Sequence, residues 1–277
     1  QFEHLRKKNK TNMIGFVIPV APKDKTSNWS KSTELLRRTI SSILNQSSSN
    51  FRIYVVFEDR PEIDFSSEKI IQIQLNLKGQ KASHMSDYHT HVRKHFKLGY
   101  EDIMLNKGIK LTRGCAEAKN NGCTHVMCVD SDDLIADDIA AFVEKNPLEY
   151  GWYIDRGYTW NEGRSFLLRH NSLTGINGST HIIRTDLIPC DFHSKFFYDY
   201  TLFESHGYTK KRLFRENGVN LKPFSTRGVI VVKHNGNASN DYFKSPTNIL
   251  KNAVKFILYQ SFFGKSLRRK FGLINSI

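Results

Sequence analysis

The first half of the chain alternates short apolar runs with helical patterns, and this alternation restricts the possible folds more than any other feature. Runs typical of buried strands occupy residues 14–20, 51–57, 70–75 and 125–129. Between them, residues 32–44 and 111–121 carry apolar side chains at helical spacing. Because strands that alternate with helices build βαβ units, we predict an α/β fold with a mostly parallel sheet flanked by helices.

The second half of the chain predicts more strands with fewer helices between them. Residues 150–168 are rich in aromatic side chains, which favours strands or a hairpin. Apolar runs at 180–184 and 228–233 predict two further strands, and the second of these ends at His234.

Composition divides the chain into three segments. Residues 1–12 are polar and basic, which is typical of a frayed N-terminal arm. We expect one domain over residues 13–245, with two halves that meet after residue 135. Residues 246–277 predict a basic amphipathic helical tail, which suits either an anionic membrane surface or packing against the domain.

A cluster of acids follows the last apolar run of the first half. Asp130, Asp132 and Asp133 come directly after it, with Ser131 between the first two. Ligands of open α/β sheets bind beyond the carboxyl ends of the strands. Hard divalent cations take carboxylate ligands and share them with substrate phosphates, so the cluster predicts a metal site. The alternative is a helix that starts at residue 134, with Asp133 as its N-cap.

The overall charge narrows the classes of ligand. The chain carries 41 Lys and Arg against 27 Asp and Glu, a formal net charge of +14. This balance favours polyanions, anionic membrane surfaces or phosphorylated ligands. The four cysteines contain no Cys-x-x-Cys pair, so we expect reduced thiols in a cytoplasmic protein rather than a zinc ribbon.

Several motifs in order resemble the glycosyltransferases of the GT-A fold, most closely family 2, over roughly residues 13–240. The first predicted strand ends in Pro19-Val20, and the second ends in the acids Glu58-Asp59. The run Asp130 to Asp133 is similar to the Asp-x-Asp motif of the family. Arg113 lies in a segment similar to the family's Ala-Arg-Asn helix, although Gly114 replaces the Asn.

Two later motifs extend the resemblance. Tyr198-Asp199-Tyr200 resembles the Glu-Asp-Tyr helix start of the family, with Tyr198 in place of the usual Glu. His234 stands where many GT-A enzymes have a late metal-ligating His. The resemblance implies that the first half of the domain binds a nucleotide-sugar and that the second half binds the acceptor.

The resemblance also implies roles for individual residues. Asp132, Asp130 and His234 are expected to bind Mn²⁺ or Mg²⁺, and Asp199 to act as the catalytic base in an inverting reaction. The residues expected to bind the nucleotide-sugar are Pro19, Val20, Glu58, Asp59, Lys107, Arg113, Asp130 and Ser131.

Each of these roles has an ordinary structural alternative. His234 is also typical of a surface turn, and Lys107 and Arg113 are also typical of surface charge in a basic protein. Glu58 and Asp59 also suit the turn that ends a strand. Asp199 is also a good N-cap, and Asp191 and Glu204 are rival candidates for the base.

These observations predict a metal-dependent glycosyltransferase that moves a sugar from a nucleoside-diphosphate-sugar to an acceptor hydroxyl, in polysaccharide or glycoconjugate synthesis. We expect a glycan or lipid-linked acceptor and no nucleic-acid partner. The expected location is the cytoplasm, either free or bound peripherally to the inner face of a membrane. One alternative is a nucleotidyltransferase that forms nucleotide-sugars, but residues 21–29 contain no Gly for the loop it needs. The other is a basic module that binds nucleic acid or lipid.

Overall fold

The computed structural model describes residues 12–64, 66–78, 100–189, 209–234 and 259–273. The strands of the first sheet are β1 (Ile14–Pro19), β2 (Phe51–Phe57), β3 (Ile70–Gln74), β4 (His125–Cys128), β6 (Gly151–Tyr153), β9 (His181–Arg184) and β10 (Lys222–Pro223). The strands of the second are β5 (Leu134–Ile135), β7 (Gly157–Asn161), β8 (Phe166–His170), β11 (Val229–Lys233) and β12 (Gln260–Phe262). The helices are α1 (Trp29–Leu44), α3 (Tyr100–Asn120), α4 (Ile139–Lys145), α6 (Thr209–Asn217) and α8 (Lys265–Lys270), with short 3₁₀ turns η2 (Lys23–Lys25), η3 (Leu173–Gly175) and η4 (Thr185–Leu187).

The first sheet has the order β10-β6-β9-β4-β1-β2-β3 and is mostly parallel. Parallel pairings join β1 to β2, β1 to β4, β2 to β3 and β6 to β10, whereas β9 runs antiparallel to both of its neighbours. The chain passes from β1 to β2 and β3 on one side, and then returns to β4 on the other side of β1. The predicted α/β fold is therefore confirmed, and β1 and β4 form a topological switch point.

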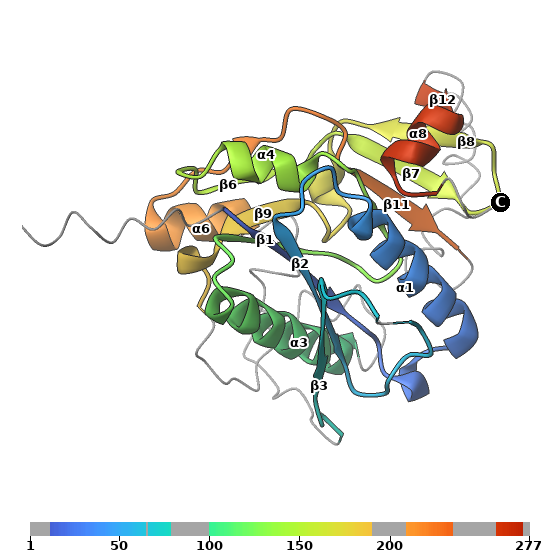
Figure 1. Ribbon diagram of the computed structural model, residues 1–277, viewed down its shortest axis with the longest axis horizontal. Coiled ribbons are helices and arrows are strands. Elements are labelled where there is room, and N and C mark those ends of the chain that lie inside the picture. Colours follow the sequence, from blue (N-terminus) through green and yellow to red (C-terminus); the bar gives the residue numbers. More distant parts are fainter. Residues whose placement is uncertain (1–11, 65, 79–99, 190–208, 235–258, 274–277) are drawn as a thin grey trace, which may run out of the picture.

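Helices cover both faces of this sheet (Figure 1). Successive side chains of a strand point to opposite faces, and β1 is buried along its whole length. Phe16 and Ile18 pack in one cluster with Leu36 of α1, whereas Val17 packs in another with Leu111 of α3. Each such buried side chain contributes about 1.5–3 kcal/mol to the stability of the fold.

Gly114 explains how α3 lies so close to the sheet. A Cβ atom at this position would lie 2.3 Å from Cγ1 of Val17. Only a residue without a side chain permits this approach, which accounts for Gly at the position where the resembled family has Asn.

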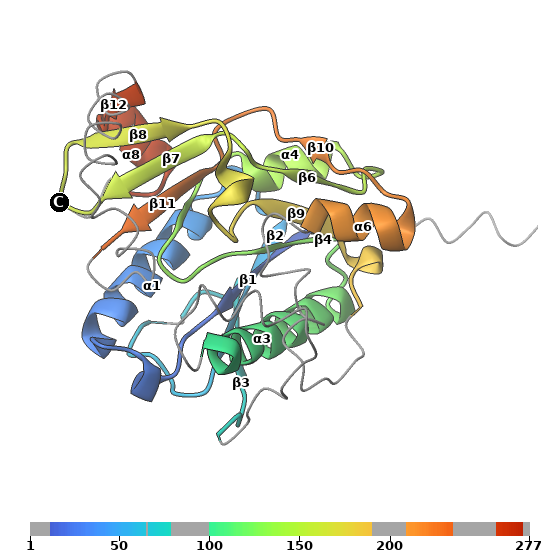
Figure 2. The ribbon, with the colours of Figure 1, turned by 180° about the vertical axis from the view of Figure 1, so that it is seen from behind.

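The second sheet has the order β12-β8-β7-β11-β5 and lies beside the first (Figure 2). The predicted aromatic hairpin is confirmed, since β7 and β8 pair antiparallel. Strand β11 runs parallel to β7, and its last residue precedes His234.

The predicted helix start at residue 134 is wrong. Leu134 and Ile135 form β5, which pairs antiparallel with β11 and is buried. The helix begins only at Ile139, after Asp138. Asp133 is therefore not an N-cap, because pairing with a distant strand overrides the local helical spacing.

The described part of the C-terminal tail packs against the domain. Within the segment predicted as a helical tail, the described residues form a six-residue helix, α8, and also a strand, β12, which was not predicted and pairs antiparallel with β8. Phe263 and Phe271 are buried in a cluster with Tyr158 and Trp160. These two rings therefore belong to the core and not to a membrane-facing surface. No helix within the described ranges is long and apolar enough to cross a membrane.

Candidate functional site

The candidate site lies at the carboxyl edge of the first sheet. Strands β1, β2, β3 and β4 are mutually parallel, so the loops that follow them meet at this edge. The loops after β1 and β4 flank the switch point, where open α/β sheets bind their ligands.

The acids after β4 form a tight turn in which Asp130 and Asp132 are half-buried. The backbone N–H of Asp133 donates to the carbonyl of Asp130 at 3.1 Å, and Ser131 lies within the turn, half-buried. Nζ of Lys107 lies 2.7 Å from Oδ1 of Asp130. Nε2 of His234 lies 3.0 Å from Oδ2 of Asp132, although the two residues are 102 positions apart.

Asp133 is buried and ties this turn to two other segments. Its Oδ2 accepts hydrogen bonds from Oγ of Ser179 at 2.6 Å and from Nδ2 of Asn177 at 2.8 Å. Its Oδ1 lies 3.4 Å from the backbone N–H of Val232 in β11. Ser179 also accepts from the backbone N–H of Asp130 at 2.8 Å. Asp133 thus holds the turn against β11, the strand that leads to His234.

The charge of this cluster is only partly compensated by the contacts described. Burial, together with the charges of Asp132 and Asp130, raises the pKa of Asp133 well above its ordinary value. The side-chain donors to Asp133 are a hydroxyl and an amide, so no cation contributes to these bonds. An added cation would therefore be stabilised at this end of β4.

The donor set fits a metal shared with a ligand better than a metal held by protein alone. Within the described ranges, no group of three or more His, Cys, Asp or Glu side chains is arranged to hold a metal ion. Asp132 and His234 form a pair. Divalent cations in phosphate-binding sites use one or two carboxylates and complete their shell with phosphate oxygens and water. The pair fits that arrangement.

The acids after β2 have a different environment. Nζ of Lys110 lies 2.9 Å from Oε1 of Glu58, and both side chains are buried, with 1% and 8% of their surface exposed. Glu58 also accepts from Nδ2 of Asn106 at 2.7 Å, and Lys110 donates to the carbonyl of Val20 at 2.8 Å. Burial lowers the pKa of Lys110, and Glu58 opposes this effect. Lys110 thus joins the ends of β1 and β2.

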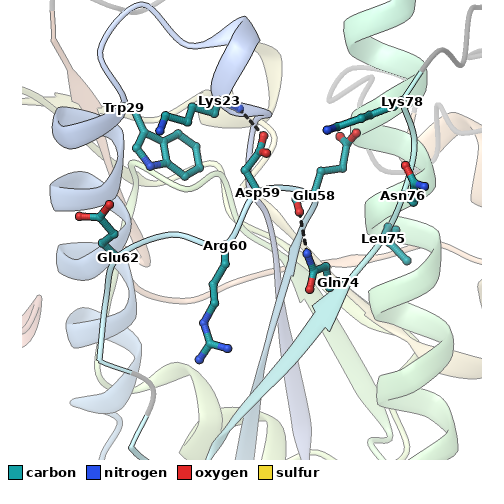
Figure 3. A pocket seen from close by; sticks show the side chains of 10 residues that line it. All are labelled: Lys23, Trp29, Glu58, Asp59, Arg60, Glu62, Gln74, Leu75, Asn76 and Lys78. Carbon is teal, nitrogen blue, oxygen red and sulfur yellow. Dashed lines mark hydrogen bonds between the residues drawn. The ribbon is translucent and has the colours of Figure 1, made fainter.

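A pocket of about 790 Å³ opens at the carboxyl ends of β2 and β3 (Figure 3). Asp59 lines it and accepts from the backbone N–H of Lys23 at 2.8 Å. The half-buried ring of Trp29 faces the same pocket. The full lining consists of Lys23, Trp29, Glu58, Asp59, Arg60, Glu62, Gln74, Leu75, Asn76 and Lys78. The lining therefore combines an aromatic ring with both donors and acceptors.

Helix α3 connects the pocket to the acids of β4. Lys107 and Lys110 lie one helical turn apart, so both reach the carboxyl edge of the sheet. One contacts Asp130 and the other contacts Glu58. Arg113 is exposed and lies almost two turns beyond Lys107, towards the opposite edge of the sheet.

The other predicted residues fall into two groups. Pro19 and Val20 are buried, and Val20 offers its backbone carbonyl rather than its side chain. Asp199, together with its rivals Asp191 and Glu204, lies outside the described residues.

Three residues with a structural part in the site were not predicted. Lys110 had a usable signal, because it follows Lys107 at helical spacing on one face of α3. Nothing in the sequence indicates that Asn177 and Ser179 bind Asp133, because it lies 44 and 46 positions away from them.

Comparisons with known proteins give structural similarity only. No protein-family model matches the sequence, and no curated protein matches it significantly. The structure is similar to residues 1–349 of S. aureus TarS in complex with UDP-GlcNAc, with 14% identity, 94% of this chain and 70% of that chain covered, and a TM-score of 0.48. It is also similar to HddC from Yersinia pseudotuberculosis, with 13% identity, coverage of 88% and 100%, and a TM-score of 0.43.

A further similar structure is 2-C-methyl-D-erythritol 4-phosphate cytidylyltransferase from Francisella tularensis. The identity is 11%, the coverage is 88% of this chain and 99% of that chain, and the TM-score is 0.38. A functional assignment therefore depends on the chemistry of the residues at the carboxyl edge of the first sheet.

Proposed function

We propose that this protein is a metal-dependent glycosyltransferase that moves a sugar from a nucleoside-diphosphate-sugar to an acceptor hydroxyl. One observation carries the proposal: the Asp132 carboxylate lies 3.0 Å from His234 at the end of β4, beside the switch point. This pair combines ligand types that suit Mn²⁺, and also Mg²⁺ through the carboxylate. The pocket at the carboxyl ends of β2 and β3 supplies groups that suit a nucleoside.

The metal would be held by Asp132 and His234, with Asp130 beside them. When bound, it acts as a Lewis acid that stabilises the negative charge of the departing nucleoside diphosphate. Lys107, which lies 2.7 Å from Asp130, would support the same charge. Asp133 orients the turn through its bonds to Ser179 and Asn177.

In the pocket, the nucleoside would contact a hydrogen-bond acceptor and the face of an aromatic ring. Asp59 is an acceptor for base or ribose donors, and Trp29 offers a ring for stacking. Glu58 has a different role in the proposal, because its ion pair with Lys110 makes it a support for the loops that form the pocket.

The acceptor substrate would bind in the second half of the domain. We propose Asp199 as the base that takes the proton of the acceptor hydroxyl, with inversion at the sugar carbon. A glycan or a lipid-linked sugar is the proposed acceptor, in polysaccharide or glycoconjugate synthesis.

Thermal denaturation with nucleotides tests the donor side. UDP, GDP, CDP and dTDP are added separately, each with and without Mn²⁺. We expect one of them to raise the Tm by roughly 5 °C at about 100 times its Kd, and only with the metal. Asp132→Asn should abolish this metal-dependent shift, whereas the control Glu216→Gln on α6 should retain it. A chain that no metal–nucleotide pair stabilises would refute the proposal.

Turnover measurements test the acceptor side and separate the two transferase classes. Asp199→Asn should keep the metal-dependent Tm shift and lower sugar transfer by roughly 10²–10⁴-fold. Release of pyrophosphate from a nucleoside triphosphate and a sugar phosphate, without sugar transfer, would instead identify a nucleotidyltransferase.

A further inference from the structure

We propose that an exposed surface on β8, β12 and α8 binds an anionic lipid bilayer. This surface combines aromatic rings with basic side chains. Its residues are Arg164, Phe166, Arg169, Tyr259, Phe262, Lys265 and Arg269. All of them are exposed.

The alternation of strand side chains produces the exposed rings. Leu167 on β8 and Phe263 after β12 are buried in the core, so their neighbours Phe166 and Phe262 point to the outer face. Phe166 and Phe262 are paired in register, and their ring centroids lie 5.8 Å apart. They remain 42% and 64% exposed. The fold thus places two adjacent large rings in contact with solvent.

The charged residues of the described segments that carry these rings have a single sign. Residues 163–169 and 259–273 contain six Lys and Arg side chains and no Asp or Glu. Arg169 donates to the backbone carbonyls of Tyr259 and Gln260, which fixes β12 beside β8. Lys265 and Arg269 are exposed on α8. This field attracts anionic partners and repels cationic ones.

An anionic bilayer matches both components of this surface. Aromatic rings are favoured at the level of the lipid headgroups, and each nearby Lys or Arg is attracted by anionic lipids. Because Phe263 and Phe271 are buried, the membrane-facing rings come from two strands rather than from one amphipathic helix.

The position of this surface relative to His234 gives the binding a use. Lys233, the residue before His234, pairs with Asn161, and the β7–β8 register places Asn161 opposite Phe166. Phe166 in turn pairs with Phe262. Since adjacent strands lie about 4.8 Å apart, Phe262 is roughly 14 Å across the sheet from Lys233. If the proposed function holds, a lipid-linked acceptor would be presented beside the candidate site, whereas membrane binding itself does not depend on that function.

Vesicle sedimentation tests the binding without any assay of catalysis. The full chain is mixed with vesicles of phosphatidylcholine alone, or with roughly a quarter phosphatidylglycerol, and pelleted. We expect binding to the anionic vesicles only, and its loss in about 0.5 M NaCl. Lys265→Ala with Arg269→Ala should weaken the partition coefficient roughly 30-fold, and Phe166→Ser with Phe262→Ser at least about 10-fold.

The matched control is Phe214→Ser. Phe214 is 56% exposed among the basic residues of α6, which lies at the other end of the molecule from β12 (Figure 1). This variant should bind as the parent chain does, and an unchanged Tm for each variant shows that the fold is intact. No binding to anionic vesicles, binding to heparin but not to vesicles, or equal losses in the Phe214 variant and the β8–β12 variants would each overturn the proposal.

Discussion

The carboxyl ends of β2 and β4 have similar sequences but different electrostatic environments. Each is a buried strand followed by neighbouring acids, and in each the side chain of one acid is buried. At β2 the buried acid is Glu58, which a cation neutralises at 2.9 Å. At β4 the buried acid is Asp133, whose side-chain donors are neutral.

This difference indicates a structural role for one end and a ligand-binding role for the other. The Glu58–Lys110 pair is complete, so the buried acid at the end of β2 is already neutralised. At the end of β4, Lys107 pairs with Asp130, but the side-chain donors described for the buried Asp133 are neutral. Burial and the charges of Asp132 and Asp130 raise its pKa. A cation supplied from outside the chain would therefore gain most at β4.

Lys110→Met should have the largest effect on stability. The substitution keeps the volume of the side chain but leaves Glu58 buried without its cation. We expect the free energy of unfolding to fall by about 3–5 kcal/mol, as measured by urea denaturation. Adding Glu58→Gln should recover part of this loss. If Lys110→Met leaves the free energy of unfolding unchanged, Lys110 does not neutralise a buried Glu58 carboxylate.

Asp133→Ala should have the next largest effect. It removes the acceptor of two buried side-chain donors, Asn177 and Ser179. Leaving these donors unsatisfied should lower the free energy of unfolding by about 2–3 kcal/mol. The control Asp24→Ala, an exposed acid, should stay within about 0.5 kcal/mol of the parent. Equal effects of the two substitutions would contradict the role given to Asp133.

Asp132→Asn should have the smallest effect on stability, and it should stabilise the protein rather than destabilise it. It removes one negative charge beside Asp130 and Asp133 and keeps a polar group next to His234. In EDTA, we expect the free energy of unfolding to rise by about 0.5–1 kcal/mol while metal-dependent nucleotide binding is lost. A variant that is less stable than the parent in EDTA would show that repulsion within the cluster is not significant.

The strands β1, β2, β3 and β4 agree with the sequence prediction to within one residue at each end. Buried apolar runs explain this agreement at β1, β2 and β4, whereas β3 is only half-buried and follows from its alternating pattern of Ile and Gln. Helix α3 is longer than predicted and starts at Tyr100 instead of residue 111. The missing part contains Asn106 and Gly108, which are poor helix formers. Packing of Leu105 and Lys110 against the sheet stabilises this segment, and no local pattern reveals such contacts.

The sequence alone determined the alternation of strands and helices, and with it the edge at which acids and ligand meet. It also placed Asp132 and His234 among the candidate ligands. Only the tertiary structure decided which acid is buried, which is neutralised and which lies against a histidine. These outcomes depend on Lys110, Asn177, Ser179 and His234, all distant in sequence from their partners. The free energy of a carboxylate is set by the solvent and charges around it, and the fold creates that environment.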